Sequence, residues 1–507
     1  MINVARTSGR AIFLGLMGSA IGTAVFADVT AEDVWADQEE ILASVGYQIT
    51  NAETRRDGDT LIVSGIEMTM STMALEGAES GSTMTMADMR LRELGDGRVE
   101  MTGGSPMILE MTMTGPEGET ITTTGTMEFT DFVAIAEGDP GAVTYEWTAA
   151  AFTMSDIFLT PEDQGEITAA LEVLALSGTM GRTDDEGVTM TAQADSAEYV
   201  WEVTSAEGGE VRAVIAMDGL AAEQVVSLGL FQGQPEEWLE RLRTGGFMSA
   251  DMSAASFTVD VSGVDNSAQP FEFSGQLQDG RFAFGLDNEG VLYETGTNGG
   301  EFSMLAGAFP VPISGSVAET GTTLRLPLDE APEPQDFEFA TRFVDLTVNE
   351  EVWAMFDPQG NLPRDPITAV IDLAGTALLT HSLLNPETWE QEEAPGQIES
   401  VTLNELHVGG LGALLTGVGA FTFDNDDLVT FEGSPRPEGT ADLRLVGGNA
   451  LIDRLVGMGL LPQDQAMGAR MMMTLFARPV EGEEDTLTSR IEVNEAGEVL
   501  ANGQRIR

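Results

Sequence analysis

The sequence contains no cysteine, no lysine and only two histidines. Without cysteine the chain has neither a disulfide framework nor thiol chemistry, so its core must supply the stability of the folded state. The 23 basic residues, all arginine, stand against 84 acidic residues, and the formal net charge is −61. This charge excludes nucleic acid as a partner and plain attraction to an anionic lipid surface. The acids are scattered singly, which indicates a solvated surface suited to a salty medium; buffering of divalent cations is the alternative.

Motifs for catalysis and for cofactor binding are also missing. His381 and His407 lie 26 residues apart, and there is no His-Glu-x-x-His run and no Gly-x-Ser-x-Gly elbow. Zinc and serine chemistry therefore lack support, no phosphate-cradling loop is present, and we expect no cofactor. Carboxylates are so abundant that a pair proves nothing. The densest runs are residues 184–186 and 424–427.

The run at 424–427 is a candidate calcium site, with Asp424, Asp426 and Asp427 as oxygen ligands. It lies between two apolar residues at a predicted hairpin. It lacks the glycine and the distal glutamate of a calcium loop, so we interpret it as a solvated turn and predict no metal site.

The N-terminus has the pattern of a secretory signal peptide. Arg6 and Arg10 precede an apolar run rich in small residues, and no acid occurs before Asp28. We expect cleavage after Ala27; a retained anchor is the alternative. No later apolar run reaches membrane length, so the mature chain is expected to be periplasmic or secreted, without a transmembrane segment.

Alternation of apolar and polar residues dominates the rest of the chain and predicts a mainly β protein, a β-rich α+β fold. Strands recur every 8 to 15 residues, as in the hairpin predicted around Asp57-Gly58. We expect long, curved antiparallel sheets with a few helices packed on the concave face. Those helices are predicted at residues 28–45, 161–176, 234–243 and 449–476, with a short one near 409–415.

Residues 336–380 are the most informative segment. Phe337, Phe339 and Phe343 alternate as in a half-buried strand, and after a phase shift Leu346 and Val348 continue it. A short helix is predicted from Asn349 to the Asp-Pro pair at 357–358. The stretch PLDEAPEP at 327–334 resembles a linker. It divides the mature chain into predicted regions 28–330 and 331–507, after a signal peptide at 1–27.

Methionine is abundant, with 26 residues, and several occur as Met-x-Met. On a strand this spacing places both side chains on one face, which fits a core of adaptable side chains. Binding of soft metals is a second interpretation. A third is a groove for a flexible apolar ligand such as an acyl chain. The candidate groove residues are Met68, Met70, Met84, Met86, Met111 and Met113.

Four groups of residues resemble an uncharacterised family of exported alphaproteobacterial proteins, domain of unknown function 2125. They are 353–358 with 362–366, 421–426, 451–461 with 476–478, and 501–504. The resemblance covers most of the mature chain and implies no catalytic residues. The strand-rich build with helices is also similar to AsmA-type envelope proteins, whose long curved sheets are associated with lipid transport; this chain lacks their membrane anchor.

These observations predict a non-enzymatic periplasmic protein that binds or shields lipid or other apolar envelope material, with an envelope protein as a further expected partner. Two alternatives remain open. One is an exported hydrolase that acts on a glycan or ester through two carboxylates facing across a cleft. The other is an acidic interaction scaffold or binder of divalent cations. The sequence leaves the oligomeric state open.

Overall fold

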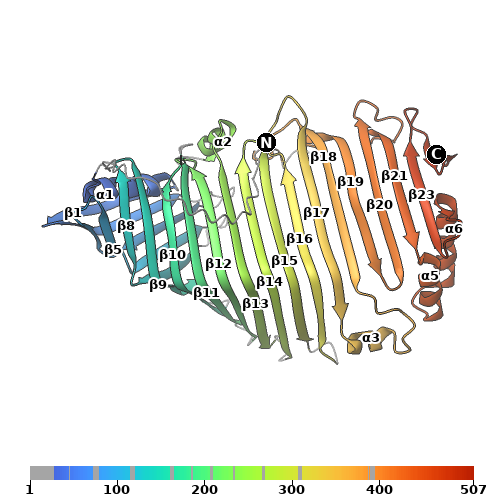
Figure 1. Cartoon of the computed structure of the whole chain (residues 1–507), viewed down its shortest axis with the longest axis horizontal. Coiled ribbons are helices and arrows are strands. Elements are labelled where there is room, and N and C mark those ends of the chain that lie inside the picture. The colour runs from blue at the N-terminus through green and yellow to red at the C-terminus, as the bar shows by residue number, and fades with distance from the viewer. Residues whose placement is uncertain are drawn as a thin grey trace, which may run out of the picture.

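The computed structural model describes residues 28–44, 46–71, 79–114, 120–159, 165–183, 187–205, 209–231, 235–264, 269–306, 311–385, 388 and 394–507. These residues form one antiparallel sheet of 25 strands with helices at its ends and edges (Figure 1). The prediction of a mainly β protein built from long antiparallel strands is confirmed. The predicted signal peptide at 1–27 and the acidic run at 184–186 lie outside the described residues.

The N-terminal part of the sheet is branched. β2 pairs with β1 and with both β3 and β4, and the two branches rejoin on β9 through β7 and β8. The strands are β1 (Tyr47–Asp57), β2 (Thr60–Ser71), β3 (Glu79–Met86), β4 (Met89–Glu93), β5 (Val99–Gly103), β6 (Met107–Thr114), β7 (Thr120–Thr130), β8 (Val133–Asp139) and β9 (Ala142–Leu159).

From β9 to β21 every strand pairs with the next one in the sequence, and β23 then pairs with β21. The strands are β10 (Gly165–Arg182), β11 (Gly187–Ser205), β12 (Glu210–Ser227), β13 (Met248–Val264), β14 (Pro270–Asp287), β15 (Gly290–Ala306), β16 (Ile313–Leu326), β17 (Gln335–Val348), β18 (Ile367–Leu379), β19 (Gly396–Gly410), β20 (Ala413–Asp424), β21 (Arg436–Val446), β22 (Arg478–Pro479), β23 (Thr486–Val493), β24 (Val499–Ala501) and β25 (Gln504–Arg505).

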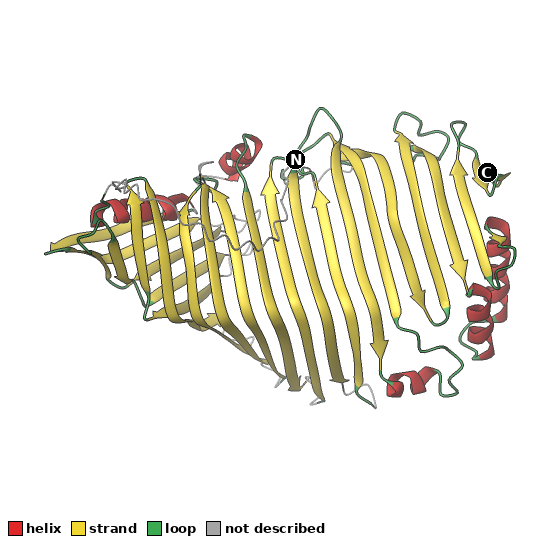
Figure 2. Cartoon of the chain, viewed as in Figure 1, coloured by secondary structure: helices red, strands yellow, loops and turns green. Residues whose placement is uncertain are grey.

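Among the described residues, Figure 2 shows the helices at the two ends of the sheet and at the strand tips, and none across its middle strands. None of these helices combines the length and apolarity needed to cross a membrane. They are α1 (Ala31–Ser44), α2 (Pro235–Arg243), α3 (Glu350–Phe356), α5 (Gly448–Gly457) and α6 (Gln463–Phe476). The helices predicted at 28–45, 234–243, 349–357 and 449–476 are therefore confirmed.

Two predicted helices are wrong. Residues 165–176 lie in β10, because pairing with β9 and β11 along its length overrides the apolar spacing that suggested a helix; residues 160–164 are outside the described part. Residues 409–415 are the end of β19, the turn at Leu411 and Gly412, and the start of β20. Gly410, Leu411 and Gly412 have positive φ there, which a helix does not allow.

The proposed division near residue 330 stays a prediction. β16 and β17, which flank residues 327–334, are paired from Gly315↔Val348 to Arg325↔Glu338. The sheet is therefore continuous across this stretch.

A compact core occupies the N-terminal end of the molecule. The apolar side of α1, with Val34, Trp35 and Ile41, packs in one buried cluster with residues of β2, β4, β5 and β9. Thr30 and Asp33 cap the helix reciprocally: the Asp33 amide donates to the Thr30 hydroxyl and the Thr30 amide to the Asp33 carboxylate. α1 therefore covers this end of the sheet.

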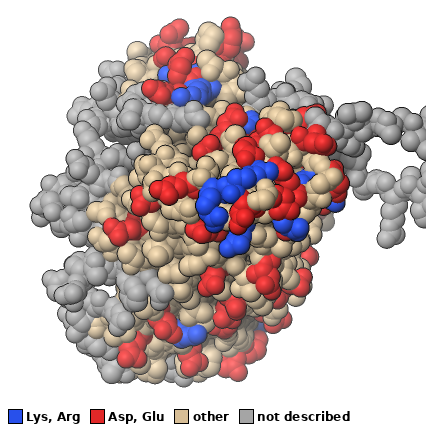
Figure 3. Space-filling model, turned by 90° about the vertical axis from the view of Figure 1, so that its left-hand side faces the viewer, with Lys and Arg blue, Asp and Glu red and all other residues tan. Residues whose placement is uncertain are grey.

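A buried ion pair fixes α1 to the sheet. The side chain of Asp37 is 2% exposed and accepts hydrogen bonds from Arg182 of β10, at 2.8 and 3.0 Å, and from the Tyr145 hydroxyl at 2.7 Å. A buried carboxylate needs such partners to remain charged. Outside this core, arginines at the same end gather among acids (Figure 3), and Arg56 and Arg92 pair with glutamates there.

In several long strands the alternation of the side chains shifts by one residue. In β14, Phe282 and Phe284 are on one face with Phe273, although their numbers differ in parity, because Asp279 between them has a φ of 49°. Ala175 in β10, Gly219 in β12 and Asp345 in β17 also have positive φ. The strands keep the same pairing register before and after these positive-φ residues. We infer that the shifts keep the apolar residues on one side of the sheet; the phase shift predicted between Phe343 and Leu346 is the one at Asp345.

Candidate functional site

One face of the sheet carries an uncharged row of residues across most of its strands. A single row of directly paired residues runs across seventeen strands and contains only uncharged side chains. Its members are Val99, Ala136, Tyr145, Met180, Met190, Gln224, Ala250, Phe284, Tyr293, Leu324, Phe339, Leu373, Leu403, Gly419, Ala441, Ile491 and Ala501. We call the side of the sheet to which this row belongs the apolar face.

The neighbouring row of directly paired residues lies on the opposite face and is rich in acids. It runs through Glu100, Ile135, Glu146, Thr179, Thr191, Glu223, Asp251, Ala283, Glu294, Thr323, Ala340, Asp372 and Glu405. Arginines on this polar face pair with the acids, as Arg281 does with Asp251 at 2.6 Å. The two faces therefore differ in charge along the same strands.

The apolar face is buried at the N-terminal end and exposed beyond it. Val99 and Tyr145 are 0% and 1% exposed, whereas Tyr293 is 38% and Phe343 51% exposed. At about 4.8 Å per strand, the part from β11 to β23 is about 50 Å long. Monomeric proteins rarely expose an apolar surface of this extent unless it binds something. The large side chains exposed on this face are Met190, Trp201, Met252, Phe273, Tyr293, Phe339, Phe343, Ile367 and Val408.

Aromatic rings lie over glycines on this face. Phe337 packs over Gly375, Phe302 over Gly315 and Phe271 over Gly263, and each pair is directly opposite across two strands. A side chain at any of these glycines would collide with the ring. The rings thereby fill the space above the glycines, which favours a broad apolar surface.

The six methionines predicted to line a groove lie at the N-terminal end. Met68 is buried in the core, and Met84 and Met86 pack against that core. Met70 of β2 and Met111 of β6 are half-buried, and each is directly opposite Ser82 of β3; the side chain of Met113 lies outside the described part. Ligand binding by these residues stays a prediction. The open part of the apolar face instead carries Met190 and Met252, which sequence reasoning missed because neither belongs to a Met-x-Met pair.

The carboxylates of the candidate calcium run are engaged within the protein. Asp424 accepts from Arg436 at 2.7 Å, and this hydrogen bond lowers the pKa of Asp424. Asp427 accepts from the amide and hydroxyl of Thr430, which lowers its pKa, and from Arg436. Asp426 is one residue before Asp427 and donates its amide to Asp424. Calcium binding stays a prediction, and no cluster of three metal-ligating residues occurs in the part of the chain that the structure describes.

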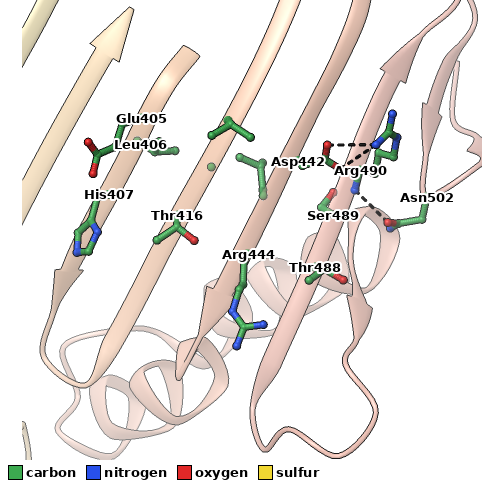
Figure 4. A pocket seen from close by; sticks show the side chains of 13 residues that line it. Glu405, Leu406, His407, Thr416, Asp442, Arg444, Thr488, Ser489, Arg490 and Asn502 are labelled. Atoms are coloured by element: carbon green, nitrogen blue, oxygen red, sulfur yellow. Dashed lines mark hydrogen bonds and ion pairs between the residues drawn. The ribbon is translucent and has the colours of Figure 1, made fainter. Parts of the chain in front are cut away.

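The polar face has a shallow depression of about 450 Å³ near its C-terminal end (Figure 4). His407 from β19, Thr416 from β20 and Thr488 from β23 line it, together with Arg444 and Arg490. Arg444 pairs with Glu483, and Arg490 with Asp442, so both cations are balanced. His381, the other histidine, lies elsewhere, with its ring nitrogen 3.0 Å from the Thr380 hydroxyl. The depression therefore offers polar contacts, but both of its arginines are already paired with acids.

The segment after α3 is held by hydrogen bonds to a buried carboxylate. Asp357 is 1% exposed and accepts hydrogen bonds from the amides of Asn361 and Leu362 and from Arg364 at 2.6 Å. Burial raises the pKa of Asp357, but the hydrogen bonds from Leu362 and Arg364 outweigh it and lower the pKa to about 2. Arg364 also lies 4.4 Å from the Trp353 ring centre. These contacts of Asp357 and Arg364 stabilise the turn that follows α3.

Comparison with known proteins gives one match. Residues 296–501 match the family described as "uncharacterized protein conserved in bacteria" (DUF2125). The match confirms the resemblance over that range, which contains the motifs at 353–366, 421–426 and 451–478. No curated protein and no solved structure matches the chain, and the resemblance to AsmA-type proteins is not confirmed.

Proposed function

We propose that the protein is a non-enzymatic carrier or shield for lipid acyl chains. Its residues 296–501 match a family of uncharacterised bacterial proteins. The acyl chains lie against the apolar face between β11 and β23. One observation carries this proposal: large apolar side chains are exposed over many neighbouring strands without a charged residue among them.

Acyl chains suit this surface better than a polar substrate does. Between β11 and β23 the paired row offers only two hydrogen-bonding side chains, Gln224 and Tyr293, so it supplies no set of oriented polar contacts. Hydrocarbon needs none, because removal of apolar surface from water drives its binding. Methionines such as Met190 and Met252 adapt to chains of different shape.

The proposed place of action is the periplasm. The pattern of residues 1–27, with two early arginines and a small-residue apolar run, supports export. A strongly acidic, cysteine-free chain is compatible with that compartment. Fractionation of cells that express the full chain, with N-terminal sequencing of the product, tests this part; an intact N-terminus in the cytosolic fraction would contradict it.

The test of the function is the lipid content of the purified protein. Mass spectrometry of an organic extract is expected to detect acyl lipids, and a fluorescent fatty acid is expected to bind the delipidated chain. The double variant Phe339→Glu/Phe343→Glu places two charges on the apolar face and should lower uptake at least tenfold, because each buried charge needs desolvation.

Val418→Glu is the matched control. Val418 is 52% exposed on the polar face, so its replacement adds a charge without touching the apolar face. Uptake should stay at the wild-type level. Empty extracts together with no fatty-acid uptake by the wild-type protein would rule the proposed function out.

A further inference from the structure

Helix α6 presents an uncharged stripe to solvent. Met467 and Met471 are 66% and 68% exposed, and Met472 and Leu475 are 51% and 50% exposed. Positions three and four residues apart lie on one side of a helix, so Met467, Met471 and Leu475 form a stripe, and Met472 borders it next to Leu475. They are more exposed than most of the large residues on the apolar face.

The opposite side of α6 is anchored. Ala466 is buried, and Arg470 pairs with Asp453 of α5. The carbonyl of Phe476, at the end of the helix, accepts hydrogen bonds from the Ser489 hydroxyl at 2.6 Å and the Asn502 amide group at 2.9 Å. The helix is therefore held in place with its stripe directed outward.

The anchor places α6 at the open end of the apolar face. Ser489 pairs directly with Leu443 and belongs to that face, one repeat from Ile491. At the other end of the sheet α1 covers the same face. α6 therefore lies beside the end of the apolar face that α1 does not cover.

We propose that α6 docks the protein on an uncharged or zwitterionic lipid surface, from which acyl chains reach the apolar face; this rests on the proposed function. Four side chains over about 12 Å of helix are too few for a stable protein interface, which needs about 800 Å² per partner. A lipid surface requires no matching shape, and methionine adapts to disordered chains. The net charge of −61 repels an anionic surface and so selects an uncharged one.

Flotation of the full chain with vesicles tests the docking. We expect binding to phosphatidylcholine vesicles, weaker binding when phosphatidylglycerol is added, and partial recovery in high salt, because salt screens the repulsion. The triple variant Met467→Gln/Met471→Gln/Met472→Gln should bind at least tenfold more weakly, since each exposed methionine contributes about tenfold when fully buried.

A triple variant at other exposed sites is the matched control: Ile108→Gln/Val418→Gln/Val429→Gln. These residues are 52%, 52% and 89% exposed, so the control removes as many apolar side chains away from α6. Circular dichroism and the melting temperature establish that both variants are folded. The control should bind vesicles as the wild type does.

Two outcomes overturn the docking proposal. One is equal vesicle binding by the α6 variant and the wild type. The other is no binding by the wild type, with a smaller oligomer for the α6 variant in light scattering, which would assign the stripe to contact between copies. The lipid extract separates the two proposals: an α6 variant that still carries lipid but binds vesicles normally contradicts only the docking.

Discussion

The two ends of the uncharged row have the same kind of side chain in opposite surroundings. At the N-terminal end, Val99 and Tyr145 are buried beneath α1. In the middle of the sheet, Tyr293 and Phe339 are more than a third exposed, although they belong to the same row of paired residues. Burial is therefore decided by whether a helix covers the face.

The covered end of the sheet contributes mainly to stability, and the open region contributes mainly to binding. The covered end has a core in which each side chain contributes to folding. In the open region, neighbouring strands are stabilised mainly by backbone pairing and cross-strand contacts. Substitutions at the covered end should lower stability strongly, and equivalent ones in the open region should change binding instead.

Removal of the arginine that holds α1 should destabilise the protein most. Arg182→Ala leaves the Asp37 carboxylate buried without its charge partner, which costs about 3–5 kcal/mol of unfolding free energy. Chemical denaturation followed by circular dichroism measures it. Arg281→Ala, which breaks an exposed pair on the open part of the sheet, should cost no more than about 1 kcal/mol. Equal losses would contradict the division.

Truncation of a core residue should also lower the unfolding free energy more than truncation of a residue on the open face. Leu91 is 0% exposed beneath α1, and Leu91→Ala is expected to lower the unfolding free energy by about 2–5 kcal/mol. Phe343 is 51% exposed, so Phe343→Ala should cost less than about 1 kcal/mol. The same denaturation experiment compares them. A loss at Phe343 as large as that at Leu91 would mean that the open face is covered in solution.

Acid should weaken the open region through Asp357. Its pKa is about 2 in the folded protein, below the usual value of 3.8, so its stabilising contribution is present above about pH 4. The contribution is lost as the pH falls from about 4 through 2, where the carboxylate gains a proton. The melting temperature of wild type should fall over this window, and that of Asp357→Asn should fall less. Parallel profiles would contradict this assignment.

A smaller effect is expected at the C-terminal end. The Asp485 carboxylate accepts hydrogen bonds from the Asn449 and Ala450 amides and thus caps the start of α5. Asp485→Ala should lower the unfolding free energy by about 1 kcal/mol. Asp485→Asn retains an acceptor oxygen and should recover most of the loss. Thermal melts of both variants make the comparison, and equal melting temperatures for Asp485→Ala and wild type would exclude the cap.

The fold was predictable because alternation is a local signal. Phe337, Phe339 and the shift before Leu346 are readable in the sequence, and so are the Asp57-Gly58 turn and the ends of α3. The helix predicted over residues 165–176 is wrong because Ile167, Leu171 and Leu174 fit helical spacing. The pairing that makes this segment a strand comes from residues distant in the sequence. Gly410 and Gly412 were interpreted as helical small residues, although their positive φ forms a turn.

The candidate site was less predictable. The methionine pairs at 68–86 stand out in the sequence, but α1, which is brought over the sheet by the fold, buries that region. Tyr293 and Phe339 are 46 residues apart and come onto one row only through β16. Shifts by one residue, as at Ala175, Gly219 and Asp279, also hide the common face from a search with a fixed two-residue period.

The pairing of neighbours in sequence order has a consequence for the size of the molecule. Between β10 and β21 each strand touches only the strand before it and the strand after it. Insertion or deletion of a whole hairpin would change the length by about 10 Å and leave both terminal structures intact, as in a modular repeat array. Span is therefore an independently adjustable property of this architecture.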